Sequence, residues 1–274
     1  MIRKTIPLLM GCMLMLALVV GCGKSEGTAA ENDSVTFVAK KVTDTTSFKR
    51  SNGELCKVLV EADVAIPDKY AGKAVDAKFV KLFSTTVLSG ADSLSIDEAV
   101  AQLVQDKLCA NKAEDIDDTE EDDALATSNV SIKIKVYPVY NHQGVLTMCV
   151  EENVAKDGVP SVAHRYHNFS MENMAVVDLE QFEENAFADM ALLLQNKLME
   201  QNKVKTPEEL SSLGFFDIYN LTVTSNFYFT ADGIVWSYRP QELTVDANTE
   251  PTILVPFADL VPFVKEGSVV EKFM

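Results

Sequence analysis

Strict alternation of hydrophobic and polar residues marks two long segments of the chain. In residues 55–66 one face carries only small or branched hydrophobic side chains, namely Cys56, Val58, Val60, Ala62, Val64 and Ile66. Residues 130–136 repeat the pattern, with Lys133 and Lys135 pointing outward. A sheet with one wet face is usually antiparallel. Both segments are therefore predicted as strands of an antiparallel sheet, and Pro67 is expected to end the first.

Hydrophobic residues at helical spacing predict helices that cover this sheet. The spacing appears after Val75 and again in residues 95–108, where Ser95 and Glu98 form a capping box. A longer hydrophobic stripe occupies residues 183–201, and Thr206 with Pro207 begins a short helix that Gly214 stops. The predicted fold class is α+β, an antiparallel sheet with packed helices.

The densest aromatic pattern lies in residues 226–239 and predicts a β-hairpin. Phe227 and Phe229 share one face of the first strand, and Ile234, Trp236 and Tyr238 share one face of the second. The loop ends in Gly233, where a hairpin often needs a residue with positive φ. This pattern indicates a core element and not a catalytic motif.

The N-terminus has the features of a bacterial lipoprotein signal. Arg3 and Lys4 precede an apolar run over residues 6–20, which is too short to span a membrane. The run closes on Gly21-Cys22 and resembles a lipobox, which implies that Cys22 becomes the lipidated N-terminus. An ordinary cleaved signal with a chance cysteine is the alternative. The predicted parts are a signal peptide (1–21), a flexible tether (22–34), an N-terminal α+β segment (35–127) and a second domain (128–274).

Charge limits the classes of partner. The chain has 24 basic and 41 acidic residues and a net charge of −17, which becomes −19 once Arg3 and Lys4 are removed with the signal. Nucleic acid is therefore not expected as a partner, because phosphate binding needs the opposite charge. A cationic partner would be attracted, although solubility alone also explains the acidity. The run 114–123 holds eight carboxylates and is predicted as a solvated, mobile loop, because it lacks the glycine of a calcium loop.

No catalytic or metal-binding motif stands out. His164 and His167 are three residues apart, and on a strand this spacing places them on opposite faces, so a metal pair is not expected. His164 is predicted to be a hydrogen-bonded structural residue. After processing Cys56, Cys109 and Cys149 remain beside Cys22, which permits one disulfide without specifying it. No cofactor is expected. Glu242 and Asp232 are weak candidates for a glycosidase carboxylate pair.

Several short motifs of the second half occur in an order that is known from one protein family. They are Val162-Ala163-His164, Asn168-Phe169, Val177-Asp178-Leu179, the hairpin from Phe227 to Ile234, and Val255-Pro256-Phe257 followed by Leu260 and Pro262-Phe263. In this order they resemble an extracytoplasmic domain of unknown function, best understood in lysozyme-sensing anti-sigma factors of the RsiV type. The resemblance covers residues 128–265 and implies an α+β domain that binds a protein.

The candidate partner-binding residues follow from that resemblance. They are His164, Tyr166, Glu242 and Asp246. Ser161 and Val162 replace two glycines that are usual in the family, and residues 245–249 replace an aromatic pair and a glycine, so lysozyme binding does not carry over directly. A role as sigma-factor inhibitor is not expected, since no spanning helix or cytoplasmic segment is recognised in the sequence.

These observations combine into one expected function and two alternatives. The expected function is a lipid-anchored, non-catalytic envelope module that binds a cationic lysozyme-type hydrolase or another envelope partner. The alternatives are an enzyme or accessory domain that acts on peptidoglycan or other glycan, with Tyr137 or Tyr140 as aromatic sugar contacts, and a structural envelope lipoprotein. Gly23 after the lipidated cysteine favours delivery to the outer membrane in a bacterium with two membranes.

Overall fold

The computed structural model describes residues 33–49, 55–117, 129–246 and 248–274. Residues Asn32–Met274 form one compact unit. The signal peptide, Cys22 and most of the tether lie outside the described residues, as do positions 118–123 of the acidic run. Within the part of the chain that is described, no helix is both long enough and apolar enough to span a membrane.

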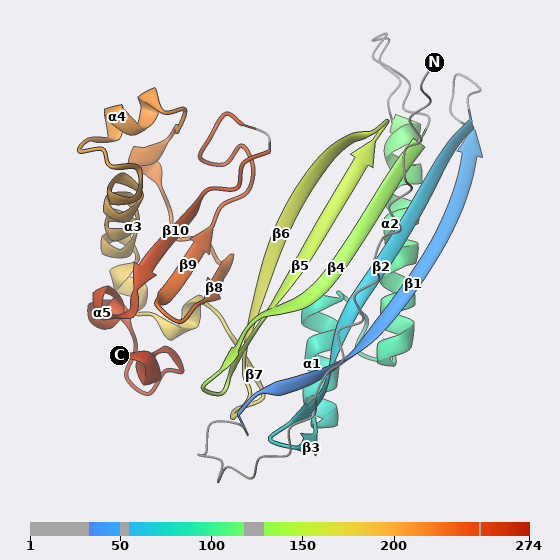
Figure 1. Cartoon of the computed structure of the whole chain (residues 1–274), viewed down its shortest axis with the longest axis horizontal. Coiled ribbons are helices and arrows are strands. Elements are labelled where there is room, and N and C mark those ends of the chain that lie inside the picture. Colours follow the sequence, from blue (N-terminus) through green and yellow to red (C-terminus); the bar gives the residue numbers. More distant parts are fainter. Residues whose placement is uncertain (1–32, 50–54, 118–128, 247) are drawn as a thin grey trace, which may run out of the picture. The chain divides into compact units, whose positions relative to one another are not determined.

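A seven-stranded sheet forms one layer of this unit (Figure 1). Its order is β1-β2-β4-β5-β6-β7, and β3 pairs with β2. The strands are β1 (Val35–Lys49), β2 (Leu55–Tyr70), β3 (Lys73–Ala74), β4 (Asn129–His142), β5 (Val145–Lys156), β6 (Val159–Ser170) and β7 (Ala175–Val177). The predicted α+β class is confirmed, although β2 and β4 are parallel where an antiparallel sheet was expected. This parallel pair carries the sheet across the predicted domain boundary at 127/128.

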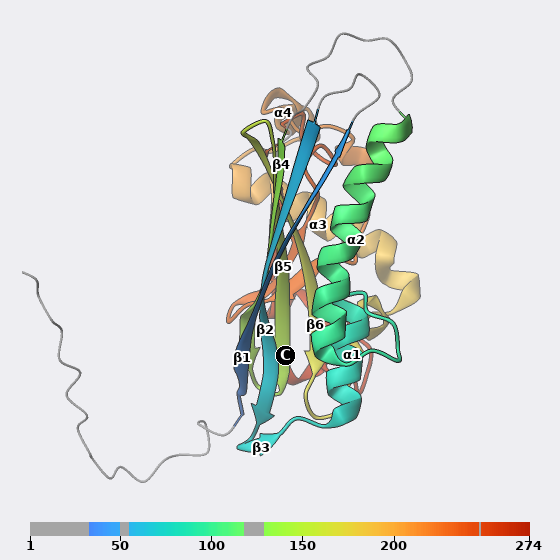
Figure 2. The same cartoon turned by 90° about the vertical axis from the view of Figure 1, so that its right-hand side faces the viewer.

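Two helices, α1 (Ala77–Val87) and α2 (Ile96–Asp117), cover one face of the sheet (Figure 2). The alternating residues of β2 and β4 pack against hydrophobic residues of both helices, including Phe79, Phe83 and Val104, all with no exposed surface. The predicted capping box is present, because Glu98 accepts from the Ser95 backbone N–H and Ser95 Oγ accepts from the Glu98 backbone N–H. The helical spacing and the strand alternation therefore build one common core.

Three elements differ from the sequence expectation. Strand β1 was not predicted, since its face toward α2 mixes Lys40 and Asp44 with hydrophobic residues; both are held there by α2, through Asp97 and Gln105. Strand β2 continues past Pro67 to Tyr70, where a register shift lets β1 pair beyond the proline. Helix α2 extends to Asp117, so the first residues of the acidic run are helical rather than loop.

The C-terminal layer is a three-stranded sheet with helices packed against it. The sheet order is β10-β9-β8, with β8 (Phe227–Phe229), β9 (Gly233–Ser237) and β10 (Thr252–Pro256). The α-helices are α3 (Phe187–Asn202), α4 (Pro207–Ser212) and α5 (Phe257–Leu260), and the short 3-10 helices are η2 (Leu179–Gln181), η3 (Glu184–Ala186), η4 (Ile218–Asn220), η5 (Val261–Phe263) and η6 (Val270–Phe273). The predicted aromatic hairpin is present, and both aromatic faces are buried in this second core.

The role expected for Gly233 is wrong. Its φ is not positive, and the turn is instead closed by Thr230, whose hydroxyl donates to the Gly233 carbonyl and accepts from the Asp232 and Gly233 backbone N–H groups. Glycine is needed here because β10 passes very close. A Cβ at position 233 would lie 2.1 Å from the Val255 carbonyl oxygen.

Candidate functional site

The large sheet contacts the C-terminal layer along the outer edge of β6, as well as through the end of β4. Asn226, just before β8, joins the two with its side-chain amide. Its Oδ1 accepts from the Tyr166 backbone N–H at 2.9 Å, and its Nδ2 donates to the carbonyl oxygens of His164 and Ser237, both at 3.2 Å. The amide therefore satisfies edge groups of β6 and fixes the start of the hairpin at the same time.

A second amide makes a buried contact two residues further along β6. Asn168 Nδ2 donates to the Phe227 carbonyl at 2.8 Å, and its Oδ1 accepts from the Thr147 hydroxyl at 2.7 Å. Asn168 and Thr147 are both buried. Since a buried amide without partners would be costly, this bond specifies how the hairpin is placed on the sheet.

His164 lies between two carboxylates. Its backbone N–H donates to Glu250 Oε1 at 2.8 Å, its ring Nδ1 is 2.7 Å from Glu250 Oε2, and its Nε2 is 3.9 Å from Glu151 Oε2. His164 is thus hydrogen-bonded, as predicted. Glu250 belongs to the segment before β10, so this contact is a third link between the two layers.

The His164 contact ends a row of alternating charges across the open face of the sheet. The register aligns Lys41, Asp63, Lys135, Glu151 and His164 on five neighbouring strands. Lys41 and Asp63 are 2.8 Å apart, and Lys135 and Glu151 are 3.5 Å apart. Exposed pairs of this kind stabilise little, but a shift of register by one residue would break all of them.

Aromatic rings and a thiol fill the space beside this row. The rings of Tyr166 and Tyr228 have centroids 4.4 Å apart, and the Tyr137 hydroxyl donates to Glu151 Oε2 at 3.2 Å. Burial raises the pKa of the Cys149 thiol to about 11, so it stays protonated and is a poor nucleophile at neutral pH. Cys109 and Cys149 are free thiols in the described structure.

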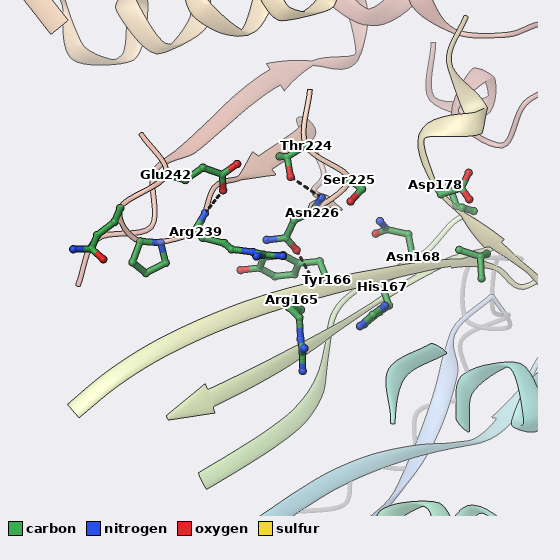
Figure 3. Close-up of a pocket in the computed structure, with 14 residues that line it drawn as sticks. Arg165, Tyr166, His167, Asn168, Asp178, Thr224, Ser225, Asn226, Arg239 and Glu242 are labelled. Carbon is green, nitrogen blue, oxygen red and sulfur yellow. Dashed lines mark hydrogen bonds between the residues drawn. The ribbon is translucent and has the colours of Figure 1, made fainter. Parts of the chain in front are cut away.

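A pocket of about 670 Å³ opens between the edge of β6 and the loops of the C-terminal layer (Figure 3). Its walls are residues 165–168 of β6, residues 176–178 at the end of β7, residues 224–226 before β8, and residues 239–242 after β9. Asn168 and Asn226 are engaged in the bonds described above. Arg165 and Arg239 supply its positive charge, and Asp178 and Glu242 its negative charge.

The two acidic candidates after the hairpin are both engaged in turns. Glu242 Oε2 accepts from the Arg239 backbone N–H at 2.9 Å, and the Arg239 carbonyl accepts from the Glu242 N–H at 3.1 Å. Asp246 accepts from the Thr249 hydroxyl at 2.6 Å and from the Asn248 N–H at 2.9 Å. The bond from Thr249, and to a lesser extent the bond from Asn248, lower the pKa of the Asp246 carboxyl group. A general acid needs a raised pKa instead.

Three exposed hydrophobic side chains lie on two paired segments next to this acidic segment. Residues 213–216 run beside residues 243–245: the Phe216 N–H donates to the Leu243 carbonyl and the Val245 N–H to the Gly214 carbonyl. Their outward side chains are Leu213, Phe216 and Val245, which are 57, 38 and 73% exposed. We call these three residues the apolar patch.

The structure brings some of the predicted site residues together and separates others. Tyr166 and Glu242 both line the pocket, and His164 is bonded beside it, whereas exposed Asp246 belongs to the segment of the apolar patch. His164 and His167 lie on opposite faces of β6, as expected. Burial is the main cause that lowers the pKa of His167 to about 4, and the positive charge of Arg165 is the second cause. His167 is therefore neutral at neutral pH. Among the described residues no group of three metal-ligating side chains occurs.

The sequence did not indicate which residues join the two layers, nor that Tyr140 is buried in the second core. Asn226 and Glu250 have no motif of their own, although the position of Asn226 directly before an aromatic strand was a usable signal. Asn168 entered only through the Asn168-Phe169 motif of the family resemblance, which did not indicate its contact with the hairpin. Tyr140, expected as a surface sugar contact, is buried against His142, Phe229 and Phe273, so that expectation is wrong. A bulge in β4 after Pro138 turns it inward.

Comparison with known proteins connects this layer to one family. Residues 178–258 match the family model "Protein of unknown function (DUF3298)". The match runs from the end of β7 to the start of α5 and includes the hairpin and Glu250. The resemblance to RsiV-type domains stays a prediction. No curated protein matched the chain in the comparison.

Two solved structures of DUF3298 proteins share the fold over most of the chain. A DUF3298 family member from Bacteroides fragilis superimposes with a TM-score of 0.64 at 16% identity, over 88% of this chain and 98% of its own. A DUF3298 family protein from Pseudomonas aeruginosa gives 0.52 at 14% identity, over 84% and 95%. The large sheet and the DUF3298 region thus occur together in these proteins.

Proposed function

We propose that this chain is a non-catalytic binding module of the bacterial envelope that binds a cationic protein of the lysozyme type. The observation that carries the proposal is the apolar patch beside the carboxylates of residues 242–250, in a chain with a net charge of −17. Exposed hydrophobic residues surrounded by polar ones are typical of protein-binding surfaces. The acidic surroundings favour a basic partner over an acidic one and would speed its encounter.

The arrangement of the nearby carboxylates supports a binding role over a glycosidase role. Glu250 is bonded to His164, Glu242 to the backbone of its own turn, and Asp246 to Thr249. A glycosidase needs one carboxyl group that holds a proton near neutral pH and faces the substrate. Each of these three side chains is instead engaged in fixing the polypeptide.

The proposal is tested by titrating hen lysozyme into the soluble domain, residues 34–274, by calorimetry at low and at physiological salt. We expect one-to-one binding that weakens with salt but persists at physiological salt. Salt screens the attraction between opposite charges, but it does not weaken the hydrophobic contacts of the apolar patch. Val245→Ser should reduce the affinity by about tenfold, as expected for a valine that becomes buried on binding.

Val159→Ser is the matched control. Val159 is 72% exposed, against 73% for Val245, and lies at the start of β6. Its replacement should leave the affinity unchanged. Binding that disappears at physiological salt, or that both variants weaken equally, would reduce the interaction to unspecific attraction between opposite charges and contradict the proposal.

We further propose that Cys22 anchors the protein to the envelope by its acyl chains, with delivery to the outer membrane where two membranes exist. Mass spectrometry of the N-terminal peptide from the membrane fraction should show a triacylated or diacylated Cys22. In a Cys22→Ala variant the unmodified precursor should accumulate. An unmodified N-terminus in the mature wild-type protein would contradict the proposal.

A further inference from the structure

The pocket of Figure 3 has one cation that extends into it from the C-terminal layer. Arg239 follows β9 in the turn 239–242, and Figure 3 shows its side chain extending from that turn toward β6. Arg165 stands on the alternate face of β6 from Tyr166 and contacts Glu152 at 3.9 Å. Among the described residues, the Arg239 guanidinium forms no ion pair or side-chain hydrogen bond.

The turn fixes the backbone at Arg239, whose side chain is exposed. Its backbone N–H donates to Glu242 Oε2, and its carbonyl accepts from the Glu242 N–H, so the turn is closed from both ends. Gln241 takes a φ of +64° between them. The carboxylate that lies closest in sequence is therefore bonded to the backbone of Arg239 and not to its guanidinium. A guanidinium offers five N–H donors in a planar fork, and this geometry matches an oxyanion with two oxygens.

The charge of the walls selects the kind of anion. Asp178, which caps the backbone N–H of Glu180, and Glu242 line the pocket with the two arginines. With Arg165 paired to Glu152 on the other face of β6, two carboxylates face the one guanidinium of Arg239, so they would repel hydrogen phosphate, which carries two charges, more strongly than a monoanion. A group with a single negative charge spread over two oxygens would still pair with Arg239 in a bidentate way.

We infer that the pocket between β6 and the turn 239–242 binds a ligand through a monoanionic carboxylate that pairs with the Arg239 guanidinium. The remainder of the ligand would lie along the Tyr166–Asn168 segment of β6, in a volume of about 670 Å³ that exceeds a carboxylate several times. In an envelope location such carboxylates come from peptide C-termini or from acidic sugars. The inference does not depend on lysozyme binding, and each can fail without the other.

The experiment follows amide shifts in two-dimensional NMR while ligands are added to the soluble domain up to about 5 mM, a range suited to weak binding. The probes are acetyl-D-alanyl-D-alanine, N-acetylmuramic acid, the carboxyl amide of each, and inorganic phosphate. We expect saturable shifts at residues 165–168 and 239–242 with at least one free carboxylate and none with its amide. The peptide and the sugar acid distinguish the two sources.

Arg239→Gln should weaken binding of the carboxylate at least tenfold. Arg239→Lys keeps the positive charge but loses the paired N–H donors of the guanidinium, so its affinity should lie between those of the wild type and Arg239→Gln. Lys78→Gln is the control for net charge, because exposed Lys78 lies on α1 outside the pocket. Thermal unfolding of each variant confirms folding. No binding of either acid, equal binding of acids and amides, stronger binding of phosphate, or an equal loss in Lys78→Gln would each overturn the inference.

Discussion

Replacing Gly233 with alanine will prevent the native pairing of β9 with β10. Gly233 pairs with Pro256, and an added Cβ would lie 2.1 Å from the Val255 carbonyl oxygen and 2.8 Å from the Pro256 Cα. Both obstacles are backbone atoms, so no side chain can rotate to make room. We expect a loss of more than about 4 kcal/mol in the free energy of unfolding, at the upper end of single-substitution effects.

The measurement is denaturant unfolding followed by Trp236 fluorescence, since the only tryptophan is buried in the affected sheet. Gly72→Ala is the control. Gly72 has a φ of +74° and open space around its Cβ position, so its replacement should cost only about 1 kcal/mol of backbone strain. A Gly233→Ala protein within that margin of the wild type would show that the two strands do not approach as closely as described.

Replacing Asn226 with alanine should have the second largest effect, because it removes three hydrogen bonds, two of which join the layers. The Tyr166 N–H and the carbonyls of His164 and Ser237 all lose their partner. With about 1 kcal/mol for each bond and a further cost for buried groups left unpaired, we expect a loss of roughly 3–5 kcal/mol. Asn226→Asp keeps the acceptor for the Tyr166 N–H but loses the N–H donors to the two carbonyls. Its free energy of unfolding should therefore lie between those of the wild type and Asn226→Ala.

A local readout separates this effect from general destabilisation. Hydrogen exchange of the Tyr166 amide should become much faster than that of the β4 and β5 amides, since only the edge of β6 is released. Asn248→Ala is the control, because among the described residues Asn248 bonds only through its backbone N–H, to Asp246. Uniform acceleration of exchange in both sheets would contradict a role for Asn226 at the junction.

Asn226→Ala and Asn226→Asp also test whether the pocket depends on the bonds that Asn226 makes between the two layers. The turn that holds Arg239 begins two residues after Ser237, to whose carbonyl Asn226 donates. Loss of the Asn226 bonds should therefore loosen both walls of the pocket. The apolar patch belongs to residues 213–216 and 243–245, which are held by their own backbone bonds and should be less affected.

Local patterns were sufficient for most elements of the fold. Alternation in residues 55–66 and 130–136 predicted β2 and β4, and helical spacing with Ser95 and Glu98 predicted the start of α2. These signals work because one face of each element must be buried, so its sequence repeats at the period of its own backbone. These signals did not predict β1, because this strand lies at the sheet edge and α2 covers only part of it.

The sequence alone determined the α+β class, the order of the elements and the aromatic core of the hairpin. Only the tertiary structure decided the parallel pairing of β2 with β4, the need for glycine at position 233, and the contacts that Asn226 and Glu250 make with β6. The reason is physical: these features depend on atoms that are between 22 and 86 residues apart in the chain. Periodicity reports which face of an element is buried, but not which distant backbone group a side chain meets there.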